Sequence, residues 1–320
     1  MTIKIGALCW NQYTDWRALL EAGQHADHLG YDSLWTWDHL YPIVGDSNGP
    51  ILEGWMTLAA WAQATTRVKI GLMVSANTFR EPALTAKMAT TLDHISNGRA
   101  ILGIGAAWNE AEHVAYGLPF GSGAPERLRW LREALPVMQG MLRGDAPSSA
   151  GERYHVKAVR NLPAPVQSRL PLLIGGGGEK VTLKLVARYA DACNIGGGVE
   201  SVRRKEAILQ EHCRAVGRDH REIERTTIVG AVVIRDSSTE ARRVFERLFE
   251  SNGKAQLWTD QPVGTPDEVA ATIRPYLEIG PGYRHLLAGF PAPYDRESMT
   301  RFATEVRPRL EASLRPGTSP

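Results

Sequence analysis

Short apolar runs recur along the 320-residue chain, and each is followed by an amphipathic segment of helical period. The apolar character of the runs is continuous rather than alternating, which is typical of strands buried on both faces of a parallel sheet. Eight such runs are present, at Ile3–Cys9, Ser33–Trp37, Val68–Val74, Ala100–Ala106, Leu170–Ile174, Ala192–Ile195, Thr226–Ile234 and Tyr283–Leu287. Eight strands that alternate with helices predict an α/β protein, a single (β/α)8 TIM barrel over residues 1–314.

The segments between these runs carry helix signals at their ends. Asp15–Leu29 stops at Gly30, and Ala83–Ile95 begins after Pro82, as is usual for helix termini. The other expected helices are Glu53–Thr66, Pro125–Leu142, Glu179–Tyr189, Val199–Val216, Thr239–Phe249, Pro266–Glu278 and Arg296–Leu314. A doubly wound open sheet also alternates strands with helices, and it is the structural alternative to the barrel.

Two segments interrupt the alternation of runs and helices. Residues Gly144–Arg169 contain Pro, Gly and Ser clusters around Tyr154, and indicate an excursion or hairpin, while Ser251–Pro266 indicates a second long loop. In a barrel the long loops that follow strands build the active-site face, so we expect loop insertions on the C-terminal face. We expect the tail, residues 315–320, to be disordered.

The charge and cysteine content restrict the partners of the chain. Lys plus Arg number 37 and Asp plus Glu number 35, so the protein has no strong overall field to hold nucleic acid or an anionic membrane. No run approaches the roughly 20 apolar residues of a membrane helix. Three distant cysteines without metal-ligand spacing indicate a reduced, cytoplasmic protein and no metal site. The expected partner is a small molecule, alone or with a second subunit.

Polar and aromatic residues follow the expected strands at their carboxyl ends, where the active sites of such barrels lie. The first four runs lead into Trp10-Asn11, Asp38-His39, Ser75-Ala76-Asn77 and Trp108-Asn109. Aromatic and amide groups beside glycines suit a flat, amphipathic ring system better than a metal or a peptide. Trp10, Asn11 and Trp108 are the candidate walls of a substrate pocket, although each tryptophan alone is as compatible with the core.

Four consecutive glycines, Gly175, Gly176, Gly177 and Gly178, stand directly before the helix expected from Glu179. Unhindered backbone N–H groups at the start of a helix favour an anion, so we expect a phosphate there, with the Thr182 hydroxyl as a further contact. A flexible turn without a ligand is the alternative interpretation. The chain has no GxGxxG or Walker pattern, which argues against a Rossmann dinucleotide site and an ATPase.

His39 is the candidate catalytic residue, because it stands at a strand end beside Asp38 and between Trp37 and Tyr41. A neutral imidazole in that place can accept or donate the proton that accompanies hydride transfer. A structural histidine is the competing interpretation. His25, His28 and His94 fall inside expected helices and are interpreted as surface or packing residues.

Several motifs together resemble the luciferase-like monooxygenase superfamily. They are Gly71–Val74, Thr78–Pro82, Ser96–Arg99 and Leu102–Glu110. Two later stretches, Ile174–Lys180 and Ala190–Asn194, resemble the deazaflavin-dependent branch of that superfamily. The resemblance extends over nearly the whole chain, and it is more specific to the superfamily than to one reaction.

The resemblance implies a (β/α)8 barrel that binds coenzyme F420, or FMN in other branches, with the ring at the barrel mouth. It implies that Met73–Val74 is a cis peptide bond behind the ring, which Ser75 and Asn77 could anchor. It also implies that Asp38, His39 and Asn109 contact the ring or its side chain, and that Gly176–Gly178 lie near the phosphate. A homodimer is a family-level expectation.

One departure from the family pattern concerns the substrate. The resembling sugar-phosphate dehydrogenases carry an acidic residue inside the motif after the fourth strand, where this chain has Ala106-Ala107-Trp108. That difference argues against a sugar-phosphate dehydrogenase, and Glu110, one step past Asn109, is expected to face elsewhere.

Three functions remain open at this point. The leading hypothesis is F420-dependent hydride transfer to or from an uncharged organic substrate. The alternatives are an FMN-dependent monooxygenase, which would need a separate flavin reductase, and a noncatalytic flavin-binding protein on the same fold.

Overall fold

A computed structural model describes residues 2–254 and 260–314 of the chain. Its centre is a closed barrel of parallel strands: β1 (Lys4–Cys9), β2 (Ser33–Thr36), β3 (Lys69–Leu72), β5 (Ala100–Gly105), β8 (Leu172–Gly175), β9 (Ala192–Asn194), β10 (Glu224–Ala231) and β13 (Tyr283–Phe290). The barrel closes because β1 pairs with both β2 and β13, while β3 pairs with β5. The predicted (β/α)8 barrel is therefore confirmed, and the open sheet is excluded.

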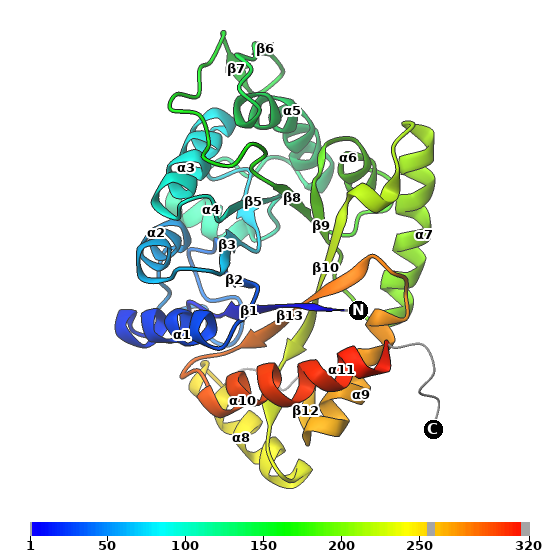
Figure 1. The fold of residues 1–320 in the computed structure, drawn as a ribbon. Helices are drawn as coiled ribbons and strands as arrows, with labels where there is room; N and C mark the ends of the chain where they lie inside the picture. Colours follow the sequence, from blue (N-terminus) through cyan, green and yellow to red (C-terminus); the bar gives the residue numbers. More distant parts are fainter. Residues whose placement is uncertain (1, 255–259, 315–320) are drawn as a thin grey trace.

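Helices surround the barrel (Figure 1). They are α1 (Trp16–His28), α2 (Gly54–Ala64), α3 (Pro82–Ile95), α5 (Ala124–Leu142), α6 (Thr182–Tyr189), α7 (Val199–Ala215), α8 (Ser238–Ser251), α9 (Pro266–Leu277), α10 (Arg296–Arg301) and α11 (Arg307–Ser313). A π-helical turn, Phe302–Val306, separates α10 from α11 within the single helix expected there. One short helix, α4 (Glu110–Tyr116), was not predicted.

Local chemistry explains where several helices begin. The Asp15 carboxylate accepts a hydrogen bond from the Ala18 N–H at the start of α1. Thr265 and Glu268 form a capping box at the start of α9, which satisfies two backbone N–H groups that the helix leaves free. These caps fix the ends of helices that an apolar stripe alone would leave undefined.

The lumen of the barrel is closed by an apolar plug in which Trp35 lies across the interior. A Cβ atom at Gly71 would stand 2.6 Å from the Trp35 ring, so the indole fits only because glycine occupies that strand position. Leu8, Met73, Leu173 and Leu287 pack in the same buried cluster. The plug separates a cavity at the carboxyl ends of the strands from a second cavity at their amino ends.

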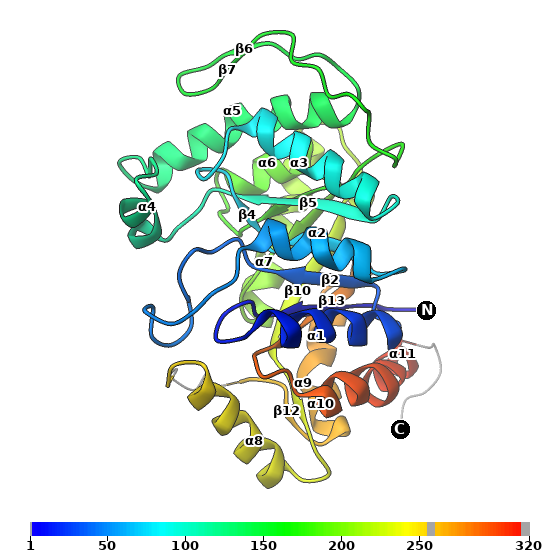
Figure 2. The same cartoon turned by 90° about the vertical axis from the view of Figure 1, so that its left-hand side faces the viewer.

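The two long loops take different places. Residues 144–169 contain an antiparallel hairpin, β6 (Ser149–Ala150) and β7 (His155–Val156), as predicted. This segment follows α5 and lies along its outer side, where Glu133 accepts N–H groups from Glu152 and Arg153 (Figure 2). None of its residues lines the cavity at the carboxyl ends of the strands, although the Tyr154 hydroxyl reaches Asn77 on that side.

The described part of the second loop does lie at the mouth. Asn252 follows α8 and its amide approaches the Gln12 amide after β1 at 3.4 Å. The loops after β2 and β5 complete this face, and α4 belongs to the second of them (Figure 2). The expected disordered tail, residues 315–320, lies outside the described residues.

Candidate active site

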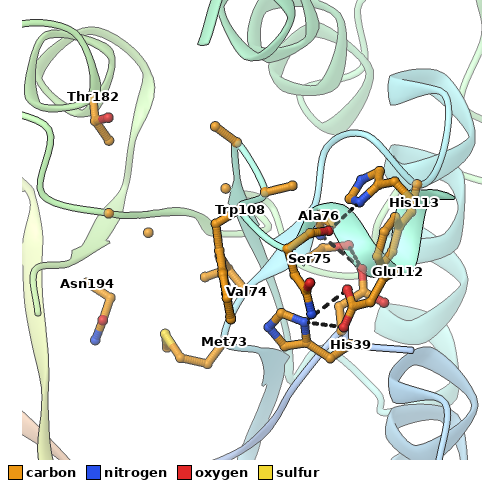
Figure 3. A pocket seen from close by; sticks show the side chains of 18 of the residues that line it. His39, Met73, Val74, Ser75, Ala76, Trp108, Glu112, His113, Thr182 and Asn194 are labelled. Carbon is orange, nitrogen blue, oxygen red and sulfur yellow. Dashed lines mark hydrogen bonds and ion pairs between the residues drawn. The ribbon is translucent and has the colours of Figure 1, made fainter. Parts of the chain in front are cut away.

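A cavity of about 340 Å³ opens at the carboxyl ends of the strands (Figure 3). Many of its lining residues were predicted from the sequence: Asp38, His39, Met73, Val74, Ser75, Trp108, Asn109, Gly175, Gly176 and Thr182. Glu112, His113, Phe79 and Asn194 line it as well and were not predicted. The ends of parallel strands thus bring residues far apart in sequence to one place.

Other predicted residues lie elsewhere. Trp10 is buried against Trp37, with ring centroids 5.0 Å apart, and the Asn11 amide donates hydrogen bonds to the carbonyls of Trp37 and Leu52. Neither residue lines the cavity, so both belong to the packing beneath the mouth. Asn77 is also buried, and its amide donates to the Tyr154 hydroxyl at 3.1 Å. Gly177 and Gly178 stand just outside the lining.

Asp38 lines the cavity, but its carboxylate is already fully engaged. Arg80 binds it through two N–H groups at 2.7 and 3.1 Å, and the Ser75 hydroxyl and the Ala76 N–H donate to it at 2.8 and 3.0 Å. Such a bidentate, buried pair is a strong positioning contact. Asp38 therefore ties the end of β2 to the segment after β3, and its carboxylate is not the partner of His39.

The partner of His39 is Glu112 on α4 (Figure 3). The two carboxylate oxygens lie 2.8 and 3.1 Å from Nδ1 of His39. The Glu112 side chain is 1% exposed and also accepts the N–H groups of Leu40 and Tyr41 at 3.3 Å. An ionised carboxylate only accepts, so Nδ1 carries the proton. Nε2 has no hydrogen-bond partner among the described residues, and the ring lines the cavity.

His113, the residue after Glu112, is held in the opposite way. Its Nδ1 lies 2.7 Å from the Asn109 carbonyl and its Nε2 lies 2.6 Å from the Thr78 hydroxyl. Because a carbonyl only accepts, Nδ1 donates to it and Nε2 accepts from Thr78. Burial lowers the pKa of His113, which fits this neutral form. His113 thus fixes the backbone of Asn109 and leaves no nitrogen free for chemistry.

The floor of the cavity is tightly packed around the Met73–Val74 bond, which is cis, as the resemblance implied. The Val74 methyl groups would stand 2.7 Å from a Cβ at Gly105 and 2.8 Å from one at Gly175. Only glycine at these two positions lets Val74 approach the strands so closely. A smooth, side-chain-poor floor results, which fits a flat ring.

The helix that follows the glycine segment begins later than predicted. The helix begins at Thr182 rather than at Glu179, so the glycines do not form its first turn. The Gly176 N–H donates to the Asn194 carbonyl at 3.0 Å, and its φ of +120° favours glycine. A Cβ at Gly177 would stand 2.6 Å from the Lys205 ammonium. Lys205, on α7, therefore supplies positive charge beside the glycines.

The rim of the cavity is aromatic. Trp108 is 62% exposed, and its ring centroid lies 5.3 Å from that of His39. Phe79 and Phe120 flank His113, with ring centroids 4.9 and 4.7 Å away. The lining contains no Lys or Arg within the described residues, and no group of three or more metal-ligating side chains occurs among them. No described helix is long and apolar enough to span a membrane.

Known proteins match this chain over most of its length. The model of the luciferase-like monooxygenase family matches residues 3–260. The F420-dependent glucose-6-phosphate dehydrogenase of Amycolatopsis mediterranei (strain U-32) is 28% identical over 325 residues, 92% of this chain and 95% of the relative.

Two solved structures share the fold. The coenzyme F420 dependent tetrahydromethanopterin reductase from Methanopyrus kandleri matches with a TM-score of 0.77 at 20% identity, and the match covers 97% of this chain and 100% of that chain. The oxygenating constituent of 3,6-diketocamphane monooxygenase from Pseudomonas putida, in complex with FMN, matches with a TM-score of 0.75 at 19% identity over 97% and 99%. At these identities the likeness establishes the barrel.

Proposed function

Because this chain belongs to the luciferase-like monooxygenase family and is an oxidoreductase, we propose that it uses coenzyme F420 for hydride transfer to or from a small, uncharged organic substrate. The observation that supports this most directly is the His39–Glu112 pair at the rim of a glycine-floored cavity. The imidazole is oriented by a buried carboxylate and leaves Nε2 free toward the space where a ring would lie.

The residues of the cavity fit a flat cofactor with an anionic side chain. The backbone of Met73–Ser75 and the floor at Gly175 and Gly176 would hold the ring, and Asn109 would contact it. Thr182 and Lys205 stand beside the glycine segment where a phosphate would lie. When bound, F420 supplies a hydride donor or acceptor, whereas reduced FMN also reacts with oxygen.

His39 moves the proton that accompanies hydride transfer. Nε2 accepts it from a substrate hydroxyl, or returns it to a carbonyl in the reverse direction. Glu112 keeps the proton of the imidazole on Nδ1 and faces the positive charge that appears when Nε2 is protonated. Glu112 is thus a positioning residue, since its carboxylate acts through His39.

The lining favours an uncharged substrate over a sugar phosphate. Its carboxylates are Asp38 and Glu112, and no Lys or Arg of the described residues lines the cavity. Arg80 lies outside the lining, where it is paired with Asp38 and Glu53. A phosphate at the reacting end would meet no cation there. Trp108 and Phe79 offer apolar surface instead.

An FMN-dependent monooxygenase with a separate reductase is the second candidate, because one fold neighbour was solved in complex with FMN. Fluorescence titration with oxidised F420 and with FMN separates the two. We expect F420 to bind at least about tenfold more tightly, a difference of about 1.4 kcal/mol. Equal or tighter FMN binding favours the monooxygenase. Binding of either cofactor without turnover on any alcohol or carbonyl tested favours a noncatalytic flavin-binding protein.

A further inference from the structure

A second cavity lies at the opposite end of the barrel, under Trp35. Its volume is about 540 Å³, larger than that of the cavity at the mouth. Trp35, Ile101 and Leu173 form an apolar surface, and Lys4, Arg67 and Lys69 contribute cationic side chains. We call this second cavity the basal cavity.

A continuous chain of hydrogen bonds runs along one wall of the basal cavity and passes through the buried Ser33 behind it. The Trp35 N–H donates to the Ser33 hydroxyl at 2.7 Å, and that hydroxyl donates to Nε2 of His285 at 2.7 Å. Nδ1 of His285 donates to the Glu224 carboxylate at 2.9 Å, which also accepts from the Lys4 ammonium at 2.8 Å. This wall is satisfied internally and leaves no group of the chain waiting for a ligand.

The carboxylates of the basal cavity are all paired with cations. Glu224 faces Lys4, while Asp191 accepts from Arg169 and Asp32 lies 3.4 Å from Arg307. They therefore do not supply a negative charge for a further cation. Among the described residues, Lys69 also lines the cavity and has no carboxylate within ion-pair distance of its ammonium.

The hydrogen-bond partners of Lys69 are neutral. Its ammonium donates to two neutral oxygens, the Gly98 carbonyl and the Gln167 side chain, both at 3.0 Å. An ammonium has three N–H groups, so one remains for a further acceptor. Burial lowers the pKa of Lys69, and the nearby Asp93 carboxylate opposes that shift.

We propose that the basal cavity binds a small organic anion, a monocarboxylate with a flat apolar body. The carboxylate accepts from the Lys69 ammonium, and the apolar body lies against Trp35, Ile101 and Leu173. An ionised carboxylate forms a strong, charge-assisted hydrogen bond with an ammonium, which offsets the hydration that a half-buried ammonium has lost. The site is separate from the mouth, because the apolar plug of Leu8, Met73 and Leu287 lies between the two cavities.

Isothermal titration of the full chain with 1-naphthoate tests the proposal, with 1-naphthylmethanol as the neutral probe of the same shape. Lys69→Met should weaken naphthoate binding by about tenfold or more, since a hydrogen bond between two charged groups is lost. The neutral alcohol should bind wild type and variant alike. Lys87→Met is the matched control, because Lys87 also donates to a backbone carbonyl, that of Leu162, but lies outside the cavity.

Two further measurements locate the bound probe. Ala192 lines the basal cavity, so Ala192→Phe should fill it and abolish binding, and a circular dichroism spectrum like that of wild type shows that the barrel is intact. Saturating F420 or FMN at the mouth should leave naphthoate affinity unchanged. Displacement by either cofactor, equal affinity of Lys69→Met and wild type, or no binding by wild type at millimolar probe would each overturn the proposal. The titrations do not depend on which cofactor the enzyme uses.

Discussion

The two ends of the barrel each hold a histidine bonded through Nδ1 to a glutamate. At the mouth His39 meets Glu112 at 2.8 Å, and at the base His285 meets Glu224 at 2.9 Å. The difference lies at Nε2. In His285 it accepts from the Ser33 hydroxyl, whereas in His39 it has no partner among the described residues and the ring lines a cavity. The same pair can therefore stabilise the fold or carry a proton, depending on whether Nε2 already has a hydrogen-bond partner.

The basal arrangement even has the order of a nucleophilic triad, serine to histidine to glutamate. Ser33, however, is 0% exposed and lines neither cavity. Its oxygen also accepts from Trp35, and a Cβ at Gly6 would stand 2.5 Å from it. No substrate carbonyl can approach such a hydroxyl, so burial decides against chemistry there.

The largest expected effect comes from His39→Asn. It should slow the reduction of bound cofactor by about 10²–10⁴, the usual contribution of a positioned acid or base. Cofactor affinity should change by only about 0.5–1.5 kcal/mol, as for one hydrogen bond. Single-turnover kinetics measure the first effect and titration the second.

His285→Asn is the matched control for that experiment. It should lower the free energy of unfolding, because Ser33 and Glu224 lose their shared partner, and leave the single-turnover rate within about threefold. A rate of His39→Asn that also stays within about threefold of wild type would assign the proton to another group, such as Glu110 or a water.

Glu112→Gln should have the next largest effect. It removes a charge-assisted hydrogen bond of about 1.5–3 kcal/mol, so the rate should fall about tenfold to a hundredfold. Cofactor affinity should stay within about threefold of wild type, because Glu112 acts on the imidazole and not on the cofactor. A loss of rate that is matched by a loss of unfolding free energy and of cofactor affinity would argue instead that Glu112 only stabilises the fold, and Glu112→Asp should restore part of the wild-type rate.

The two histidine–glutamate pairs also show which features of the site a sequence can predict. The apolar runs predicted the eight strands, and the rule that strand ends share one face brought His39, Ser75 and Asn109 together correctly. The same rule could not say which way a side chain turns, and so it placed Trp10 and Asn11 in a pocket that they do not line.

The sequence also could not show which side chains pair with one another in the site. Glu112 lies on a seven-residue helix too short to show a period, although Asn109 before two glutamates is a helix-start signal that could have found α4. Nothing in the sequence shows that Arg80 occupies the Asp38 carboxylate. The later start of α6, at Thr182, was also not predicted, and Val181 at its cap position makes no side-chain hydrogen bond.

A smaller effect is expected at the glycine segment of the mouth. Lys205→Met should weaken cofactor binding by about tenfold, as expected when a charged contact to a phosphate is lost. Gly177→Val should act in the same direction, because its side chain would displace the Lys205 ammonium. Titration of F420 measures both. The matched control is Lys87→Met. An unchanged affinity in a folded Lys205 variant would show that the cofactor phosphate does not lie beside Lys205.

The smallest expected effect is a pH-dependent change in stability at the basal pair, His285 and Glu224. Burial raises the pKa of Glu224, but the hydrogen bond from His285 and the ammonium of Lys4 outweigh it and bring the pKa from 4.5 to about 2. A carboxyl whose pKa is lower in the folded state stabilises the fold above about pH 4.5, and this stability disappears as pH falls toward 2. The side chain is 40% exposed, so solvent screening keeps the contribution modest.

Glu224→Gln tests this, because the amide still accepts from His285 while the charge facing Lys4 is gone. Urea unfolding should show the variant less stable than wild type near pH 7, with the gap narrowing between about pH 4.5 and 2 as Glu224 of the wild type takes up its proton. The rate of cofactor reduction near pH 7 should stay within about threefold of wild type. A gap that does not change with pH would mean that packing, rather than charge, makes Glu224 matter. A large loss of rate would join the basal pair to the chemistry of the mouth and end the distinction between the two histidines.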